Sequence, residues 1–130
     1  RSRVTNTRWV LEFAIPMIAP SSFADVLWWH GRDRPMQRAA REAGVTLAGL
    51  RRAWAIHSPL SYDLEIPSEN ALVIAAPGDA VVRPAQTLAL WEHWDRPEIR
   101  WVAGSHMAHF TRRRYVDMII EWLETRGFRP

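Results

Sequence analysis

The sequence Ala-Leu-Val-Ile-Ala-Ala-Pro-Gly-Asp-Ala-Val-Val-Arg-Pro, residues 71–84, decides the fold expected for this chain. Its first six residues are all apolar, which is typical of a strand that is covered on both faces within a parallel sheet. Pro77, Gly78 and Asp79 then predict a turn, and Pro84 predicts the start of a helix. The stretch therefore indicates a strand, a turn that carries a carboxylate, and a helix.

A second strand and a second helix are expected downstream. The strand covers 99–103, with residues 104–106 as its exit turn. Strand, helix, strand and helix over 70–128 make a βαβα unit, in which reactive groups sit in the turns that leave the carboxyl ends of the strands. Those two turns present Asp79 and His106. The first helix is expected to bury Leu88, Trp91 and Trp94, and the second Tyr115, Met118, Ile119, Trp122 and Leu123.

The upstream residues predict one more strand and a helical insert. Residues 9–17 are short, apolar and bounded by prolines, so we expect a buried strand that ends at Pro16. Over 21–67 we expect three short helices and then a loop, residues 58–70. The helices are expected to begin after Ser22, at Pro35 and after Thr46, and to stop at Gly31, Gly44 and Trp54.

The composition narrows the chemistry. The chain has 130 residues, 48% of them hydrophobic, which fits one globular domain or part of one. It has no cysteine, and all 17 of its Lys and Arg residues are arginine. These absences exclude disulfide scaffolds, zinc fingers, iron–sulfur clusters, cysteine nucleophiles and lysine Schiff bases. A lysine-free, arginine-rich chain is the usual product of a GC-rich genome, so we expect a bacterial source.

The sequence favours neither a membrane nor a nucleic acid as partner. No run approaches the ~18 apolar residues of a membrane span, and no signal-peptide pattern opens the chain, so a cytoplasmic location is expected. The net charge is +3, with 14 acidic residues interleaved among the arginines. We interpret the arginines at 112–114 as solvated, some of them paired with Asp117 or Glu98. The alternative is that they hold an anionic substrate or a phosphate backbone near His106.

Asp79 and His106 leave neighbouring strands, so the fold can bring them together. An aspartate that orients a histidine and a histidine that acts as general base are two parts of a nucleophilic triad. The plainer interpretation makes Asp79 a turn former and His106 a helix cap. His109 is the rival base, and at i, i+3 from His106 it also has metal-ligand spacing, although no third ligand is near. No role is assigned to His30, His57 and His93.

Segment 70–128 resembles the C-terminal end of the α/β-hydrolase fold family. The resemblance rests on an apolar strand, the Pro-Gly-Asp turn at 77–79 with its helix, a strand that ends in Gly-Ser-His at 104–106, and a terminal amphipathic helix. It implies an α/β fold with three layers, α/β/α, around a short parallel sheet. It also implies that Asp79 is the acid and His106 the base of the triad.

The resemblance extends more loosely upstream. Phe13-Ala14-Ile15-Pro16-Met17 resembles the strand before the acid strand, and 21–67 resembles the start of the cap that covers the substrate. Apolar residues of this insert would suit an acyl group, although helices at such spacing are also ordinary packing helices. They are Trp28, Trp29, Met36, Leu47, Leu50 and Trp54.

The nucleophile of that family is missing from this chain. In the family the triad serine lies in a Gly-x-Ser-x-Gly turn upstream of the acid, and the chain contains no such turn. The resemblance thus implies that residues 1–130 are one partial domain of a serine-type hydrolase for carboxylic esters or related acyl compounds, with no metal or organic cofactor. A missing N-terminal half or a partner chain would carry the serine. Strand 9–17 would expose an apolar edge that invites this half or a second copy of the chain.

Two other functions follow from the same residues. A hydrolase-like remnant without activity would act as an interaction module, and it predicts no hydrogen bond between Asp79 and His106. An arginine-dependent nucleic-acid binder is the third candidate.

Overall fold

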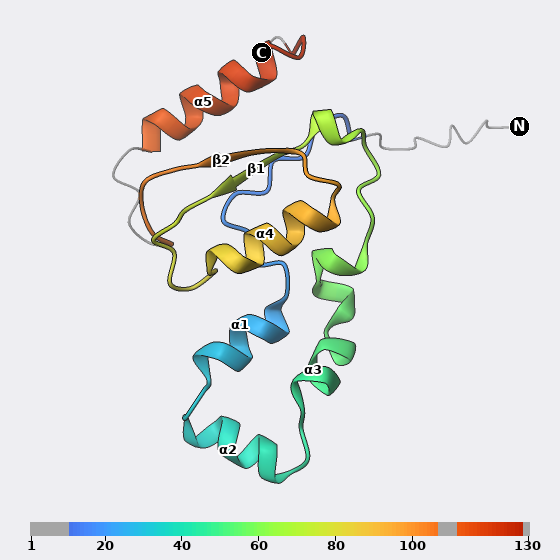
Figure 1. Ribbon diagram of the computed structural model, residues 1–130, viewed down its shortest axis with the longest axis vertical. Helices are drawn as coiled ribbons and strands as arrows, with labels where there is room; N and C mark the ends of the chain where they lie inside the picture. The colour runs from blue at the N-terminus through green and yellow to red at the C-terminus, as the bar shows by residue number, and fades with distance from the viewer. Residues whose placement is uncertain (1–10, 107–111, 129–130) are drawn as a thin grey trace, which may run out of the picture.

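The computed structural model describes residues 11–106 and 112–128 of the chain. This part is a mixed α/β structure with five α-helices and a short parallel sheet (Figure 1). Strands β1 (Leu72–Ala75) and β2 (Glu98–Trp101) pair in parallel, with Leu72 opposite Glu98. All four residues of β1 are buried, as expected of a strand covered on both faces. No helix in the described ranges is long and apolar enough to cross a membrane.

The strand expected over 9–17 is reduced to two bridges. Residues 9 and 10 lie outside the described ranges, and the rest of the segment touches the free side of β1 at two isolated parallel bridges, Ala14 with Ala71 and Met17 with Ile74. Pro16 stands between the bridges and has no N–H to donate, so the ladder cannot run continuously. The segment nevertheless lies where the third strand was predicted, beside β1 and opposite β2.

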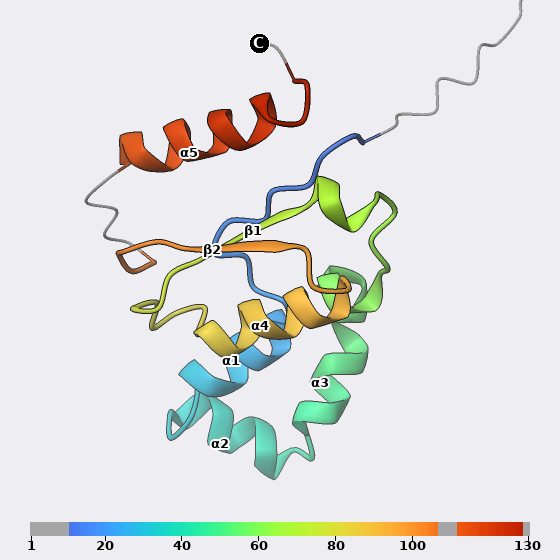
Figure 2. The same ribbon diagram turned by 45° about the horizontal axis from the view of Figure 1, so that its top comes forward.

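Helices cover both faces of the sheet. Helix α5 (Arg112–Glu124) lies over one face and α4 (Pro84–His93) over the other (Figure 2). Trp122 of α5 is buried against Leu72 and Ile74, and its ring meets Phe13 edge-on. The apolar stripe predicted for this helix is therefore confirmed, because Met118, Ile119 and Leu123 also pack on this core and Tyr115 is buried.

The buried face predicted for α4 is correct only in part: Trp91 and Trp94 are half-buried, but Leu88 is not. Leu88 is exposed, and the buried residues of this helix are instead Gln86, Thr87 and Leu90. At 100° per residue Leu88 points away from Leu90 by about 200°, so the two cannot share a face. Gln86 tolerates burial because its side-chain amide exchanges two 3.4 Å hydrogen bonds with the backbone of Ser22.

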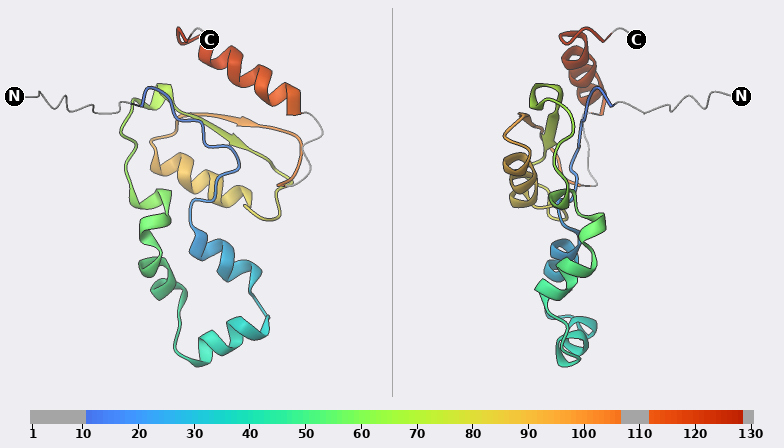
Figure 3. Two further views of the ribbon diagram at one scale, coloured as in Figure 1. Left: turned by 180° about the vertical axis from the view of Figure 1, so that it is seen from behind. Right: turned by 90° about the vertical axis from the view of Figure 1, so that its right-hand side faces the viewer.

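The helical insert agrees closely with its predicted boundaries. Its helices are α1 (Phe23–His30), α2 (Pro35–Glu42) and α3 (Leu47–Ala53), and they project away from the sheet (Figure 3). The side chain of Ser22 caps α1 and that of Thr46 caps α3, each by accepting a backbone N–H. The loop expected over 58–70 contains two short 3₁₀ turns, Pro59–Ser61 and Ser68–Asn70.

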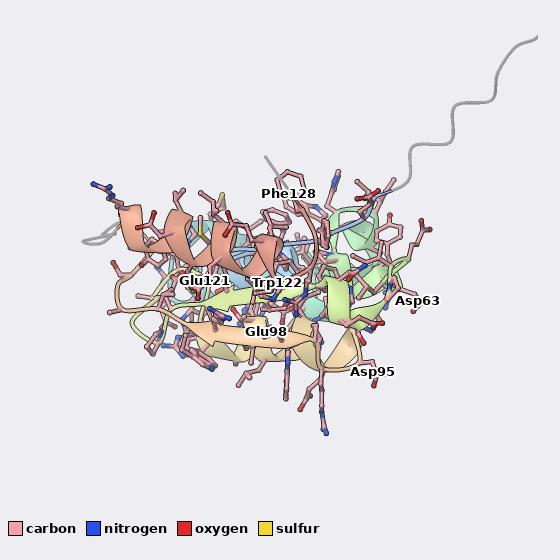
Figure 4. The ribbon with its side chains drawn as sticks, turned by 90° about the horizontal axis from the view of Figure 1, so that it is seen from above. Asp63, Asp95, Glu98, Glu121, Trp122 and Phe128 are labelled. Carbon is pink, nitrogen blue, oxygen red and sulfur yellow. The ribbon has the colours of Figure 1, made fainter. Side chains whose placement is uncertain are left out.

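A polar cluster ties α5 to β2. Trp122 lies over Glu98 and donates its indole N–H to the carboxylate at 2.8 Å (Figure 4). Arg126 and Arg100 pair with the same carboxylate at 3.1 and 2.8 Å. Burial acts to raise the pKa of Glu98, but the hydrogen bonds from Arg100 and Trp122 outweigh it and hold that pKa below its ordinary value. The cluster fixes the last helix to the edge strand.

Candidate active site

The turns that leave β1 and β2 bring Asp79 and His106 into contact. The distance from His106 Nδ1 to Asp79 Oδ2 is 3.0 Å, although 27 residues separate them in the chain. Both turns stand at the carboxyl ends of parallel strands, which explains why they share one edge of the sheet. The parallel order of the two strands therefore brings the two side chains together.

The Asp79 carboxylate is buried, with 1% of its side chain exposed, and both of its oxygens are used. Oδ1 accepts the backbone N–H groups of Val81 and Val82, each at 2.8 Å, and Oδ2 faces the imidazole of His106. Oδ1 thus stabilises the turn, as the plainer sequence interpretation of Asp79 expected. Oδ2 is available to bind the histidine. Two backbone donors also fix the carboxylate plane, so Oδ2 has one orientation.

The contact indicates which nitrogen of His106 carries the proton. A carboxylate can only accept, so Nδ1–H is the donor and, in the neutral ring, Nε2 is left with a lone pair. About a third of the side chain, 34%, is exposed, and Nε2 has no partner within the described ranges. The ring is therefore oriented by a buried acid and is partly exposed.

The two turns approach each other through glycines. A Cβ added to Gly78 would lie 2.8 Å from the carbonyl oxygen of Gly104, closer than real Cβ contacts come. Gly104 itself has a φ of 144°, a conformation that side chains disfavour. Behind the second turn, Tyr115 of α5 donates its hydroxyl to the carbonyl of Ala103 at 2.9 Å. The Asp79–His106 distance is thus set by backbone contact.

Other candidates from the sequence lie elsewhere. His109 is outside the described residues, so the choice of His106 over His109 stays a prediction. In residues 11–106 and 112–128 no group of three or more acidic or histidine side chains could hold a metal ion. Glu98 pairs with Arg100 and Arg126. The side chains of Arg112 and Arg114 are outside the described part of the structure, so their expected pairing with Glu98 or Asp117 stays a prediction. Arg113 of that run is exposed.

The main cavity of the insert differs from the expected acyl site. A pocket of about 390 Å³ lies between α1, α3 and the 3₁₀ turn at 59–61, and it does not touch Asp79 or His106. Of the apolar residues expected to line such a site it contains Trp54, and the charged side chains of Asp25 and Arg51 also lie in its wall. It is lined by Ser22, Ala24, Asp25, Arg51, Trp54, Ser58, Leu60 and Ser61.

An ion pair crosses that pocket. Arg51 binds Asp25 through two nitrogens, at 3.0 Å from Nε and 2.5 Å from Nη2. The hydrogen bond from Arg51 lowers the pKa of Asp25, and burial opposes it only in part. A site for hydrophobic acyl groups would not place a bidentate ion pair in its wall. This pocket therefore differs from the expected acyl site, because it contains one of the apolar residues named for that site and an ion pair besides.

Sequence reasoning missed the residues that hold Asp79. The Val81 and Val82 amides were not assigned, although an aspartate after Pro-Gly at the start of a turn is a signal for such bonds. His30 was assigned no role, and its Nε2–H donates to the carbonyl of Val81 at 3.0 Å. No local pattern could have found that contact, because 51 residues separate the two partners.

The fold and site therefore define a mixed α/β protein with an Asp–His pair at the carboxyl ends of its parallel strands. The chain is similar to the uncharacterized proteins MT2702 and Rv2627c of Mycobacterium tuberculosis strains CDC 1551 and H37Rv. Each is 38% identical over 68 residues, which cover 49% of this chain and 16% of the relative. No family model matches the chain, and no solved structure does. The relatives are bacterial, as expected from the composition.

Proposed function

We propose that this chain supplies the acid and the general base of a serine-type α/β-hydrolase that cleaves carboxylic esters or related acyl compounds. The observation that carries the proposal is the 3.0 Å contact between the buried Asp79 carboxylate and the partly exposed His106 ring. A buried carboxylate that orients a partly exposed imidazole is the arrangement of an acid and a base in a nucleophilic triad. The contact thus counts against the inactive remnant, which predicted that the two side chains would not meet.

The residues would act as follows. Nε2 of His106 takes the proton of the serine hydroxyl as the serine oxygen bonds to the acyl carbon, and Asp79 stabilises the imidazolium. The imidazolium then gives that proton to the departing alkoxide, which leaves an acyl-enzyme. Water attacks the acyl-enzyme in the same way, His106 takes its proton and returns it to the serine, and the acid product departs.

The proposal places the serine outside this chain, and the sheet edge supports that. The backbone hydrogen bonds from segment 13–18 toward β1 are made by Ala14, Pro16 and Ile18. The outward N–H and C=O groups of Phe13, Ile15 and Met17 make no backbone hydrogen bond within the described ranges. Pro16 weakens the inner ladder and leaves the outer edge able to pair. An edge of this kind accepts another strand.

Two occupants of the edge were expected from the sequence, and we favour the hydrolase's N-terminal half. The match covers 16% of each relative, so both relatives carry much more chain than the matched segment. A two-fold homodimer would instead pair the edge with its own copy in antiparallel orientation. Light scattering distinguishes the two, because the homodimer doubles the mass of the isolated chain.

Labelling with a fluorophosphonate tests the function. The probe is applied to the chain alone and to the chain combined with the polypeptide encoded directly upstream in its reading frame. We expect labelling in the combination alone, lost in His106→Ala and kept in His93→Ala, whose ring contacts the Tyr62 carbonyl far from the pair. Labelling that survives His106→Ala overturns the proposed base.

An interaction module without chemistry is the second candidate. It is favoured by exposed large apolar side chains on the insert, including Met36, Ile56 and Tyr62. Absence of labelling in both samples, together with binding of the upstream polypeptide, would select it.

A further inference from the structure

Helix α1 of the insert contacts the acid turn through a histidine. His30 stands at the end of α1, and its Nε2–H donates to the carbonyl oxygen of Val81 at 3.0 Å. That carbonyl and the N–H of Val82 belong to the same peptide unit, which is planar and rigid. The N–H of this unit donates to Asp79 Oδ1 at 2.8 Å. One peptide plane therefore joins His30 to the Asp79 carboxylate.

The hydrogen bonds from His30 through the Val81–Val82 peptide to Asp79 all run in the same donor-to-acceptor direction. A donor at the carbonyl end of a peptide polarises it and strengthens its N–H as a donor at the other end. His30 thus supports the hydrogen bond that orients Asp79, and Asp79 in turn orients His106 at 3.0 Å. The series runs from the insert to the candidate base in three hydrogen bonds.

A second contact holds the same stretch of backbone. The guanidinium of Arg83, the residue after Val82, stacks on the ring of Trp29 at 3.7 Å. Arg32 also contacts this ring, at 4.2 Å. A tryptophan between two guanidinium groups is a strong form of cation–π contact. Trp29 precedes His30, so two adjacent residues of α1 contact Arg83 and Val81 in the segment that follows Asp79.

The other end of α1 is attached as well. Ser22, the N-cap of α1, exchanges two 3.4 Å hydrogen bonds with the side chain of Gln86 near the start of α4. Helix α1 therefore lies along residues 81–86 and is fixed to them at both ends. The insert cannot shift relative to the sheet without pulling on the segment that carries the Asp79 amide donors.

We propose that Trp29 and His30 are positioning residues for the acid of the triad, so that the placement of the helical insert sets the Asp79–His106 contact. The inference rests on the proposed function for its role in catalysis. The mechanical link itself can be measured without any activity. An insert that closes over a substrate would order the acid, and an insert that swings away would release it.

The tautomer of His106 is the readout. Imidazole ¹⁵N chemical shifts report how much of the neutral ring carries its proton on Nδ1 at about pH 8.5, well above the ordinary histidine pKa of ~6.5. Asp79→Asn gives the benchmark for a lost carboxylate. We expect His30→Ala and Trp29→Ala each to lose part of the Nδ1–H form, and His30→Gln, which keeps an N–H donor, to restore it.

The chain contains a matched control. Trp54 and His57 form a similar pair in the insert, with edge-on rings, and they do not contact the acid turn in the described ranges. Trp54 is 38% exposed and Trp29 is 39% exposed, so truncation of either removes a comparable side chain. Trp54→Ala and His57→Ala should leave the His106 tautomer unchanged while affecting stability to a similar degree.

The outcomes separate the two proposals. If Asp79→Asn shifts the tautomer and neither Trp29→Ala nor His30→Ala does, the positioning role is wrong and the proposed function stands. If Asp79→Asn shifts nothing, the Asp79–His106 pair fails and both fall. In the combined protein we expect His30→Ala to lower kcat on the order of tenfold with KM unchanged, as for a small misplacement of a reacting group. An equal loss in His57→Ala overturns the positioning role.

Discussion

The sheet and the helical insert are built by different means. Around β1, the side chains of Leu72, Ile74 and Trp122 are buried together and nothing polar is left unmatched among them. In the insert Ala24 is the buried hydrophobic residue, while larger apolar side chains such as Met36, 82% exposed, face outward. The sheet region finds its apolar contacts within the chain, and the insert does not.

Polar contacts hold the insert instead. Arg51 pairs with Asp25, Arg41 stacks on Trp28 at 4.6 Å, and Gln37 donates to the Trp28 carbonyl at 2.8 Å. Contacts of this kind on a surface contribute little each, typically under about 1 kcal/mol. These contacts lie within the insert, so its helices are adjustable relative to one another, while α1 stays attached to residues 81–86. The comparison thus separates a rigid half that carries the Asp–His pair from an adjustable half that contacts it.

The largest difference between the regions should appear in activity. Asp79→Asn keeps an oxygen for the Val81 and Val82 amides but replaces the carboxylate that His106 needs, so we expect kcat to fall about 10⁴-fold. Asp25→Asn, the matched change in the insert, should alter kcat by no more than about threefold. Hydrolysis of a short chromogenic ester by the combined protein measures both. Similar losses of kcat in the two variants would show that the sheet region and the insert do not differ in this way.

Core truncation should separate the regions in stability. Trp122→Ala empties the space between α5 and β1 and removes the donor to Glu98, so we expect a loss of about 3–5 kcal/mol in the free energy of unfolding. Trp54→Ala in the insert should cost about 1 kcal/mol or less, because its ring is partly exposed. Urea denaturation followed by far-UV circular dichroism gives both values. Equal costs would show that the insert has a core of its own.

Acid should loosen the sheet region through Glu98. The folded-state pKa of Glu98 lies below its ordinary value of 4.5, so its contribution is present above that value and is lost as the pH falls through the folded value. The side chain is 35% exposed, and screening by solvent keeps the contribution to about 1 kcal/mol. Glu98→Gln should remove this part of the pH dependence. If Glu98→Gln keeps the same pH dependence of stability, another carboxylate causes the acid sensitivity.

The smallest effect is expected at the ion pair of the insert. The pKa of Asp25 is lowered from 3.8 by Arg51, so the pair stabilises above that value and is lost as the pH falls through the lower folded value. A double-mutant cycle of Asp25→Ala and Arg51→Ala should give a coupling of about 0.2–1 kcal/mol. A coupling of several kcal/mol would mean that the insert is not adjustable.

Local chemistry explains what the sequence predicted well. Helix boundaries in the insert followed from the caps at Ser22 and Thr46 and from Pro35, because a cap and the N–H that it satisfies lie three residues apart. The stripe of α5 was predicted because its period faces one surface. The face of α4 was predicted only in part, since Gln86 is buried through a partner 64 residues away.

The contacts of the candidate site also fall into those that the sequence predicted and those that it did not. Asp79 and His106 could be predicted because parallel strands deliver their carboxyl ends to one edge, which is a rule of topology. The contact of His30 with Val81 and the stack of Arg83 on Trp29 depend on how the insert settles against the sheet, and no periodicity encodes that. The strand at 9–17 was overestimated because Pro16 interrupts a ladder that its apolar pattern suggested.

The near contact of Gly78 with the Gly104 carbonyl has a consequence for inheritance. Any side chain at position 78 would force the backbone of the two turns to move apart, so a lineage that keeps the Asp–His pair is expected to keep this glycine too. A lineage that has abandoned the pair is free to replace it. The residue type at position 78 in a related sequence therefore indicates whether that protein still uses the Asp–His contact.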